Sequence, residues 1–205
     1  DEAYYTWDGT LSYDHAGRKT GMMDADMGTW YYSYDASSNL ASQADARGCV
    51  TTLSYDLLDR LEGKSYSGSC GAGGASVSYT YDDGSNGMGR RTGMADGSGS
   101  ASWTYDARGQ VESETKVIAG VGGFLTQWEY NSAGQVVRMT YPGDNLGSPG
   151  EVLSYTYHPQ GLLDTVTGDS SYVAGTDYDA AGRIVLRRLG NGLNTEHSYF
   201  AWDAQ

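Results

Sequence analysis

Large apolar residues and small or polar residues alternate along the chain, and the alternation recurs ahead of a tyrosine. The large position comes two residues before that tyrosine, at Tyr32, Leu53, Tyr79, Trp103, Trp128 and Tyr155. The polar position comes directly before it, at Ser33, Ser54, Thr80, Thr104, Glu129 and Thr156. Successive side chains of a strand point to opposite faces of a sheet. The pattern therefore predicts strands with one aromatic face and one small, polar face.

The recurring tyrosine defines a repeat. It stands at Tyr13, Tyr34, Tyr55, Tyr81, Tyr105, Tyr130, Tyr157, Tyr178 and, in a degenerate copy, Tyr199. The intervals between these tyrosines are 21, 21, 26, 24, 25, 27, 21 and 21 residues. A unit of this length accommodates two strands of roughly six or seven residues and two short turns. Repeated units that bury surface only against their neighbours indicate a stacked array, so the sequence predicts an antiparallel sheet that grows hairpin by hairpin.

A turn follows each tyrosine. In "YDHAGR", "YDARGQ", "YNSAGQ" and "YDAAGR", an Asp or Asn stands three residues before a Gly. Asp or Asn at the first position of a type I turn bonds the backbone two residues on, and Gly at the fourth adopts a positive φ. Because a strand resumes directly afterwards, the motif predicts a hairpin closed by a glycine bulge. The repeat-defining residues are Tyr13, Asp14, Gly17, Tyr34, Asp35, Tyr55, Asp56, Tyr81, Asp82, Tyr105, Asp106, Gly109, Tyr130, Gly134, Tyr157, Gly161, Tyr178, Asp179 and Gly182.

A second, variable turn is expected about midway between successive tyrosines. The inserted segments "SYSGSCGAGGAS", "VIAGVGGF" and "YPGDNLGSPGE" lie there, and they are rich in Gly, Ser or Pro, as loop tips are. Between the two turns an aliphatic residue commonly appears, at Leu40, Leu61, Val111, Val136, Leu163 and Ile184. The longer units are thus interpreted as one unit with insertions at one permissive place.

Composition supports an all-β fold and excludes several classes of partner. The chain has 18 Tyr, 5 Trp, 30 Gly and only 3 Pro; aromatic residues favour strands and Gly favours tight turns. A formal net charge of -13 argues against nucleic-acid binding, which needs a basic surface, and against an anionic membrane surface. No run of 18 apolar residues exists, so no membrane span is expected. The N-terminal "DEAYYTWDGT" does not resemble a signal peptide.

With these residues in view, the chain resembles the Rhs or YD-repeat family, whose hallmark "YDxxGRL" recurs about every 21 residues. The hallmark is matched by Tyr13…Gly17-Arg18, Tyr55-Asp56…Arg60-Leu61, Tyr105-Asp106…Gly109 and Tyr178-Asp179…Gly182-Arg183-Ile184. The segment from Tyr157 to Leu162 departs from it at single positions. Eight registered copies extend the resemblance over nearly the whole chain.

The resemblance implies a hairpin array that winds into a spiralling sheet or part of a hollow shell. Residues 1–205 would form a single array, either a fragment of a longer one or a subunit that self-assembles. In Rhs proteins, insecticidal toxin complexes and teneurins, such shells enclose a polypeptide or present a surface to other cells. Family members are typically secreted, anchored at the cell surface or delivered by a secretion apparatus. The self-cleaving aspartyl core segment of toxin-bearing members is not recognised in this sequence.

The repeated polar side chains are interpreted as scaffold. A strand Tyr and the Asp after it project to opposite faces, so they do not converge on one substrate. Eight near-identical copies also exceed what an enzyme needs. The arginine after the turn is expected to pair with an Asp of a neighbouring repeat and to contribute little. These arginines are Arg18, Arg60, Arg90 and Arg183.

The remaining polar residues suggest neither a catalytic site nor a metal site. Carboxylates at the variable turns could bind Ca²⁺, although their better explanation is as the first residue of a Gly-closed turn. They are Asp24, Asp26, Asp45, Asp96 and Asp144. A Ca²⁺ loop needs six or more oxygens, and "MMDADMG" supplies two carboxylates. His15, His158 and His197 occupy unrelated points of the repeat, and no GxSxG motif is present. The expectation is a protein without enzymatic activity, cofactor or resident metal.

The two cysteines leave one question open. Cys49 and Cys70 each follow a motif tyrosine by 15 residues, which makes them equivalent positions of consecutive units. Equivalent strands are two apart, roughly 9–10 Å at 4.7–4.9 Å per strand, beyond the ~7 Å Cα separation that a disulfide tolerates. The inserted "GSCGAGG" could fold back and close that gap. The sequence alone does not decide whether Cys49 and Cys70 pair.

The leading hypothesis is a non-enzymatic structural segment that builds an extracellular, secreted or cell-surface β-shell or fibre. Its expected partners are other copies of itself or further repeats of the same shell, together with an enclosed polypeptide or a surface glycan. The alternative is a carbohydrate-binding adhesion module, in which exposed Tyr and Trp rings stack on sugars.

Overall fold

The computed structural model describes residues 9–71, 74–144 and 148–200, and its regular elements there are 17 β-strands. The chain divides into two units, residues 1–83 with 89–100 and residues 84–88 with 101–205. Parts of the sequence discussed above, namely residues 1–8 of the N-terminus and short stretches of two inserted segments, lie outside the described residues. No helix long and apolar enough to cross a membrane occurs in the described part of the chain.

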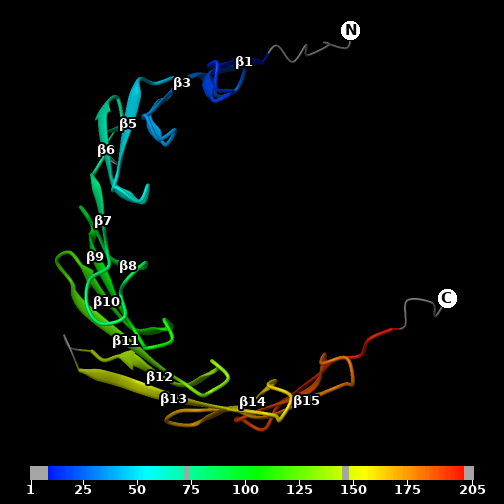
Figure 1. Cartoon of the computed structure of the whole chain (residues 1–205). Coiled ribbons are helices and arrows are strands. Elements are labelled where there is room, and N and C mark those ends of the chain that lie inside the picture. Colours follow the sequence, from blue (N-terminus) through cyan, green and yellow to red (C-terminus); the bar gives the residue numbers. More distant parts are fainter. Residues whose placement is uncertain (1–8, 72–73, 145–147, 201–205) are drawn as a thin grey trace. The chain divides into compact units, whose positions relative to one another are not determined.

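The first unit is an antiparallel array in chain order (Figure 1). Each strand pairs with the next, and every second connection is a turn at the Tyr-Asp motif. Its strands are β1 (Thr10–Tyr13), β2 (Lys19–Asp24), β3 (Gly28–Tyr34), β4 (Leu40–Ala44), β5 (Cys49–Tyr55), β6 (Leu61–Gly68), β7 (Val77–Tyr81) and β8 (Arg91–Asp96).

The second unit repeats this arrangement. Strands β10 to β17 pair antiparallel, each with the next in the chain. They are β10 (Val111–Ile118), β11 (Gly122–Tyr130), β12 (Val136–Pro142), β13 (Pro149–Tyr157), β14 (Leu163–Thr167), β15 (Ser171–Tyr178), β16 (Ile184–Leu189) and β17 (Asn194–Glu196). Strand β9 (Gly99–Tyr105) begins in the first unit and ends in the second. The prediction of an all-β array of hairpins is confirmed.

The predicted alternation along the strands is also observed. At each large position the side chain is half-buried, as in Tyr32 and Trp128, and at each polar position it is exposed, as in Ser33 and Glu129. The small face pairs hydroxyls across strands: the Ser33 and Ser42 oxygens lie 2.7 Å apart. Each hairpin therefore has one aromatic and one small, polar side.

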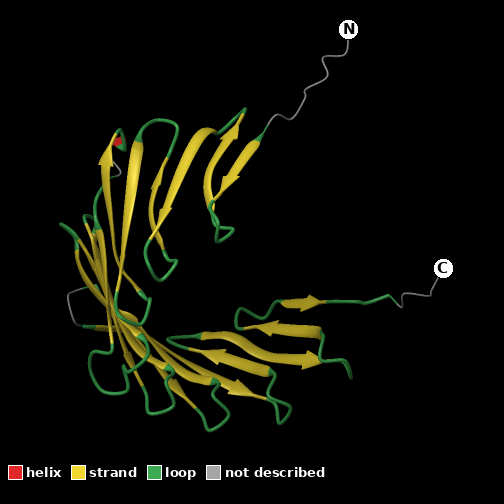
Figure 2. Ribbon diagram, turned by 45° about the horizontal axis from the view of Figure 1, so that its top comes forward, coloured by secondary structure: helices red, strands yellow, loops and turns green. Residues whose placement is uncertain are grey.

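The aromatic side is covered less than the repeat pattern predicts. Stacked hairpins were expected to bury it, yet in the described residues the only buried hydrophobic residues are Cys49 and Leu153. Figure 2 shows the reason, since in the described part of each unit the strands form a single layer that no helix or second sheet covers.

One expectation about the insertions is wrong. The extra residues of the fourth unit lie in the Tyr-Asp turn itself, not at the variable turn. The Asp82 N–H donates to the Arg90 carbonyl at 3.1 Å, so the two partners lie eight positions apart, compared with four in the first turn. Positive φ angles at Asp82 (66°), Gly84 (73°), Asn86 (60°) and Gly89 (76°) allow this long excursion.

Candidate functional site

The Tyr-Asp turns carry the most densely bonded side chains of the array, and they share one geometry. In the first turn, Gly17 N–H donates to the Asp14 carbonyl and Asp14 N–H to the Arg18 carbonyl, both at 3.0 Å. Oδ1 of Asp14 accepts the N–H groups of Ala16 and Arg18 at 2.9 Å. Gly17 has a φ of 79°. This is the predicted type I turn with a glycine bulge, and the same bonds recur at Asp56, Asp106, Asn131 and Asp179.

The second carboxylate oxygen of the turn Asp binds an arginine of the same turn. Arg18 Nε donates to Asp14 Oδ2 at 2.7 Å, and Arg183 Nε to Asp179 Oδ2 at 2.7 Å. The backbone N–H and then the guanidinium of Arg18 hold the pKa of Asp14 below its ordinary value. The expected pairing with a neighbouring repeat is therefore wrong for Arg18 and Arg183, whose carboxylate partner lies four residues back in the chain.

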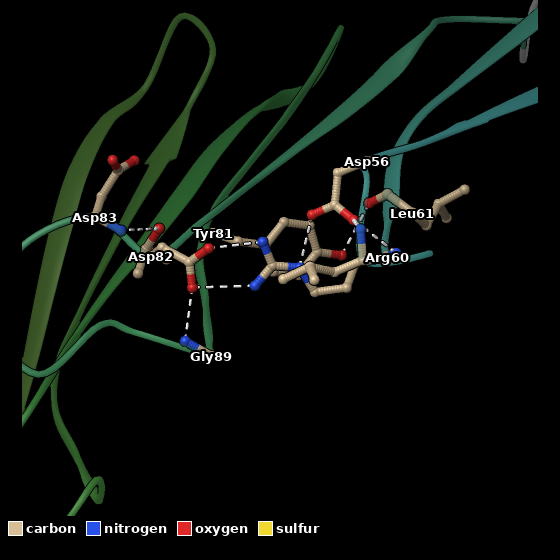
Figure 3. Close-up of polar contacts among 9 residues, drawn as sticks. Asp56, Arg60, Leu61, Tyr81, Asp82, Asp83 and Gly89 are labelled. Atoms are coloured by element: carbon tan, nitrogen blue, oxygen red, sulfur yellow. Dashed lines mark hydrogen bonds and ion pairs between the residues drawn. The ribbon is translucent and has the colours of Figure 1, made fainter.

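Arg60 makes both kinds of contact and joins two consecutive turns (Figure 3). Its Nε donates to Asp56 Oδ2 at 2.7 Å, while Nη1 and Nη2 donate to the two oxygens of Asp82 at 3.0 and 2.6 Å. The guanidinium carbon lies 4.4 Å from the centre of the Tyr81 ring. Gly89 N–H also donates to Asp82, at 2.6 Å. The Arg60 bonds and then the Gly89 bond lower the pKa of Asp82.

In most repeats a side chain at the Arg60 position reaches the next turn. Arg18 donates to Ser38 Oγ at 2.9 Å and Asn39 to Asp59 Oδ1 at 2.7 Å. In the second unit, Gln110 donates to the Gly134 carbonyl at 3.0 Å and Gln135 to the Gly161 carbonyl at 2.7 Å. We call this set the turn ladder; its linking residues are Arg18, Asn39, Arg60, Gln110 and Gln135.

The motif tyrosines form a second line of inter-repeat bonds. Tyr34 donates its hydroxyl to the Lys19 carbonyl at 2.8 Å, and Tyr130 donates to the Val111 carbonyl at 2.7 Å. Five further hydroxyls act in the same way, those of Tyr55, Tyr81, Tyr157, Tyr178 and Tyr199. Each acceptor lies in the preceding hairpin, two strands before the turn that its tyrosine opens.

Strand pairing explains why these carbonyls need a side-chain partner. Strand β2 pairs with β3 only from Gly21 onward, and β10 pairs with β11 only from Ser113 onward. The first carbonyl after each turn, such as that of Val111, therefore lies outside the region in which its strand is paired with the following strand. A half-buried carbonyl without a donor is costly, and the phenol supplies one. Partial burial raises the pKa of Tyr130 and Tyr157, consistent with neutral donors.

The structure joins Cys49 and Cys70 in a disulfide with a Cα–Cα separation of 4.5 Å. The expected separation of 9–10 Å is wrong because Cys70 lies just beyond the end of β6, the strand adjacent to that of Cys49, and not two strands away. Cys49 pairs with Gly68 at the end of the adjacent strand β6, and Cys70 follows two residues later. Gly68 has a φ of 78° and lies so close to the Gly48 carbonyl that a side chain would clash.

Three of the five variable-turn carboxylates, those of Asp24, Asp45 and Asp96, accept bonds within their own turn. Asp24 accepts the N–H groups of Asp26 and Met27, and Asp96 accepts those of Ser98 and Gly99. Asp45 binds the Arg47 guanidinium at 2.6 Å. Among residues 9–71, 74–144 and 148–200, no group of three or more His, Cys, Asp or Glu side chains could hold a metal ion.

The sequence missed one polar cluster, around His158. This residue stands where other turns have Asp, and its Nε2 donates to the Thr176 carbonyl at 2.7 Å. Nε2 also lies 3.5 Å from Asp164 Oδ1, and the ring meets the Tyr178 ring at 87°. Thr176, which is fully buried, takes the place of the large aromatic residue. His15 and His197 lie in the first Tyr-Asp turn and after β17. The sequence signal for the His158 cluster was the departure of the repeat at Tyr157 from the motif.

No protein-family model matches the chain, and no curated protein matches it significantly. Solved structures do. A crystal structure of TcdB2-TccC3 with Cdc42 gives a TM-score of 0.79 at 17% identity, covering 94% of this chain and 10% of that chain. The Photorhabdus luminescens Tc holotoxin pore with the TccC3 D651A mutation gives 0.78 at 17%, with the same coverage. The chain thus spans about a tenth of these chains, and the likeness shows a shared β-hairpin fold.

Proposed function

We propose that the chain is a structural YD-repeat segment that builds the wall of an extracellular or secreted β-shell, and that it has no enzymatic activity. The observation that carries the proposal is the double line of bonds between consecutive turns. The turn ladder joins consecutive turns through five side chains, and seven motif tyrosine hydroxyls bond carbonyls of the preceding hairpin. A surface committed in this way to repeat-to-repeat contacts fits a wall better than a catalytic site.

The fold shared with the toxin-complex chains supports this function. Those chains are about ten times longer, so a segment such as this one would be one stretch of a much larger array. The half-buried aromatic face also supports it. In a shell, that face would be covered by other repeats or by an enclosed polypeptide, which would complete the burial that a single layer cannot provide.

The last described strand supports further hairpins as partners. Tyr199 donates its hydroxyl to the Ile184 carbonyl at 2.9 Å, as the inner motif tyrosines do, and Arg183 lies 4.3 Å from its ring centre. The repeat pattern therefore continues through residue 199. Among the described residues β17 is shown paired with β16, and a free strand edge offers backbone donors and acceptors to another strand. We propose that such a strand comes from further repeats or from a second copy.

The disulfide supports an oxidising location. Disulfides persist in secreted and surface proteins and are rare in the reducing cytosol. Cys49–Cys70 closes the inserted loop onto the sheet, so the bond would stabilise the third hairpin outside the cell.

Electron microscopy of the native material tests the shell. Closed shells would support the proposal, long filaments would replace it with the fibre form, and a dispersed monomer at working concentration would contradict both. Protease digestion of the same sample adds a second reading, because an enclosed polypeptide should survive until the shell is opened.

A carbohydrate-binding role is the second candidate, favoured by one pocket of the first unit. This pocket, about 260 Å³, has Trp30 and Tyr66 among its walls and the polar side chains of Gln43 and Arg47 beside them. Aromatic rings with nearby hydrogen-bonding groups suit a sugar ring. This role would be supported if the protein bound to a glycan array and a Trp30→Ala variant did not. If the protein bound no glycan on the array, the role would be contradicted.

A further inference from the structure

The turn ladder is interrupted at one place in the second unit. In the seventh turn His158 replaces the turn Asp, and Leu162 stands where other repeats have Arg, Asn or Gln. An apolar side chain cannot make the inter-turn hydrogen bond. A pocket of about 500 Å³ lies at this position, between the seventh and eighth turns, and is lined by His158, Gln160, Leu162, Tyr178, Asp179 and Gly182 among others.

In three other repeats an arginine fills the equivalent space. The guanidinium carbon of Arg18 lies 4.8 Å from the centre of the Tyr34 ring, that of Arg60 lies 4.4 Å from Tyr81, and that of Arg183 lies 4.3 Å from Tyr199. In each case the arginine of one turn covers the motif tyrosine of the next. Such stacking is attractive because the face of an aromatic ring is electronegative.

Tyr178 is the motif tyrosine that follows Leu162. The position from which Arg18 reaches Tyr34 is therefore occupied here by a leucine, which cannot place a cation on the ring. Leu162 packs instead toward Gly182, where a Cβ would lie 3.8 Å from the leucine Cδ1. His158 contacts the Tyr178 ring with centroids 5.7 Å apart and lines the same pocket. The ring and the space beside it are therefore present without the arginine that covers Tyr34, Tyr81 and Tyr199.

Hydrogen-bond acceptors suited to a guanidinium border this space. Gln110 and Gln135 reach the glycine carbonyl of the next turn, and the corresponding carbonyl here belongs to Gly182. His158 Nε2 donates to the Thr176 carbonyl, and in a neutral imidazole that donates through Nε2 the other nitrogen, Nδ1, is an acceptor. The Asp177 and Asp179 carboxylates are already bound to Arg188 and Arg183.

We propose that the slot formed by His158, Gln160, Leu162, Tyr178 and Gly182 binds the guanidinium group of an arginine side chain from a partner polypeptide. A planar guanidinium both stacks on a ring and presents several donors, whereas an ammonium is a compact point charge. The net charge of -13 attracts a cationic partner. The proposal does not depend on whether the array builds a shell, a fibre or a monomer.

NMR titration of the 205-residue chain tests the slot directly. N-acetyl-L-arginine amide should cause saturable shifts of the His158 and Gly182 signals. The citrulline analogue, which has nearly the same shape and no charge, should bind about two- to fivefold more weakly, as expected for an exposed cation–π contact. Equal affinity for the two compounds, or the absence of saturable shifts at the slot, would overturn the proposal.

Variants of Leu162 test whether the arginine compound binds in the slot or elsewhere on the surface. Leu162→Arg should stack on Tyr178, and Leu162→Gln should reach the Gly182 carbonyl, so both should abolish binding of the arginine compound. Leu162→Met, the matched control, keeps the position apolar and should bind as the parent does. If Leu162→Arg fails to fold, the comparison of Leu162→Gln with Leu162→Met decides. Undiminished binding by Leu162→Gln would place the compound elsewhere and refute the slot.

Discussion

The hydroxyl of Tyr130 tests whether phenol-to-carbonyl bonds hold neighbouring hairpins together. It donates to the Val111 carbonyl at 2.7 Å, at a point where β10 is not yet paired with β11. Burial first, and then the charge of Asp106, raises the pKa of this phenol. Tyr130→Phe removes one oxygen atom and keeps the ring on the aromatic face.

The expected loss of stability follows from the two groups that the substitution affects, the Tyr130 hydroxyl and the Val111 carbonyl. A typical hydrogen bond contributes a net 0.5–1.5 kcal/mol, and a buried acceptor left without a donor costs about 1–3 kcal/mol. Val111 is half-buried rather than buried, so water recovers part of the second cost. We expect Tyr130→Phe to lower the free energy of unfolding by about 1–2 kcal/mol.

Urea unfolding, followed by fluorescence and circular dichroism with coincident transitions, measures this change. The control is Tyr141→Phe in the same unit, because Tyr141 is 41% exposed and no hydrogen-bond partner for its hydroxyl is found in the described part of the chain. Tyr141→Phe should change stability by less than about 0.5 kcal/mol. If the two variants unfold at the same urea concentration, solvent satisfies the Val111 carbonyl and the tyrosine hydroxyls do not join the hairpins.

Three other properties follow from the same structure. Gly17→Ala should cost about 1 kcal/mol by thermal unfolding, because a φ of 79° disfavours any Cβ even though nothing lies within 4 Å of one; an unchanged midpoint would contradict the turn assignment. Reduction of Cys49–Cys70, which are 21 residues apart, should lower stability by roughly 3 kcal/mol through loop entropy, and a Cys49→Ser/Cys70→Ser variant should no longer respond to reductant. Stability should fall below about pH 4, because turn bonds hold the pKa of Asp14 below 3.8, so protonation of the folded state removes stabilisation present at higher pH. It should fall again above about pH 10, because burial raises the pKa of Tyr157 above 10.0 and ionisation favours the unfolded chain; a flat profile at either end would contradict these shifts.

The turns were the most predictable part of the molecule. An Asp and a Gly three residues apart specify a type I turn with a bulge through bonds that span four residues, as in Asp14 to Arg18. The side-chain alternation depends only on the pleat of the strand. Both features are local, and the structure confirms them. The fourth turn differs from the prediction because its nine-residue excursion, from Asp82 to Arg90, has no short-range signature.

Contacts between repeats were not predictable in the same way. The sequence suggested that Arg18 binds a neighbouring repeat's carboxylate, yet it binds the Asp of its own turn, whereas Arg60 binds both its own Asp and that of the next turn. The choice depends on how far one turn lies from the next and on what occupies the acceptor position there. The Cys49–Cys70 bond depended in turn on which strand the inserted loop extends.

The sequence by itself determined the repeat, the strand faces and the turns, because each rests on residues within one hairpin. Tertiary structure decided which polar groups meet between hairpins: the tyrosine hydroxyls on carbonyls 15 or more residues back, the turn ladder, and the pocket left where Leu162 interrupts it. These depend on strand register and on where neighbouring strands cease to pair, and both are set by the packing of one hairpin against another.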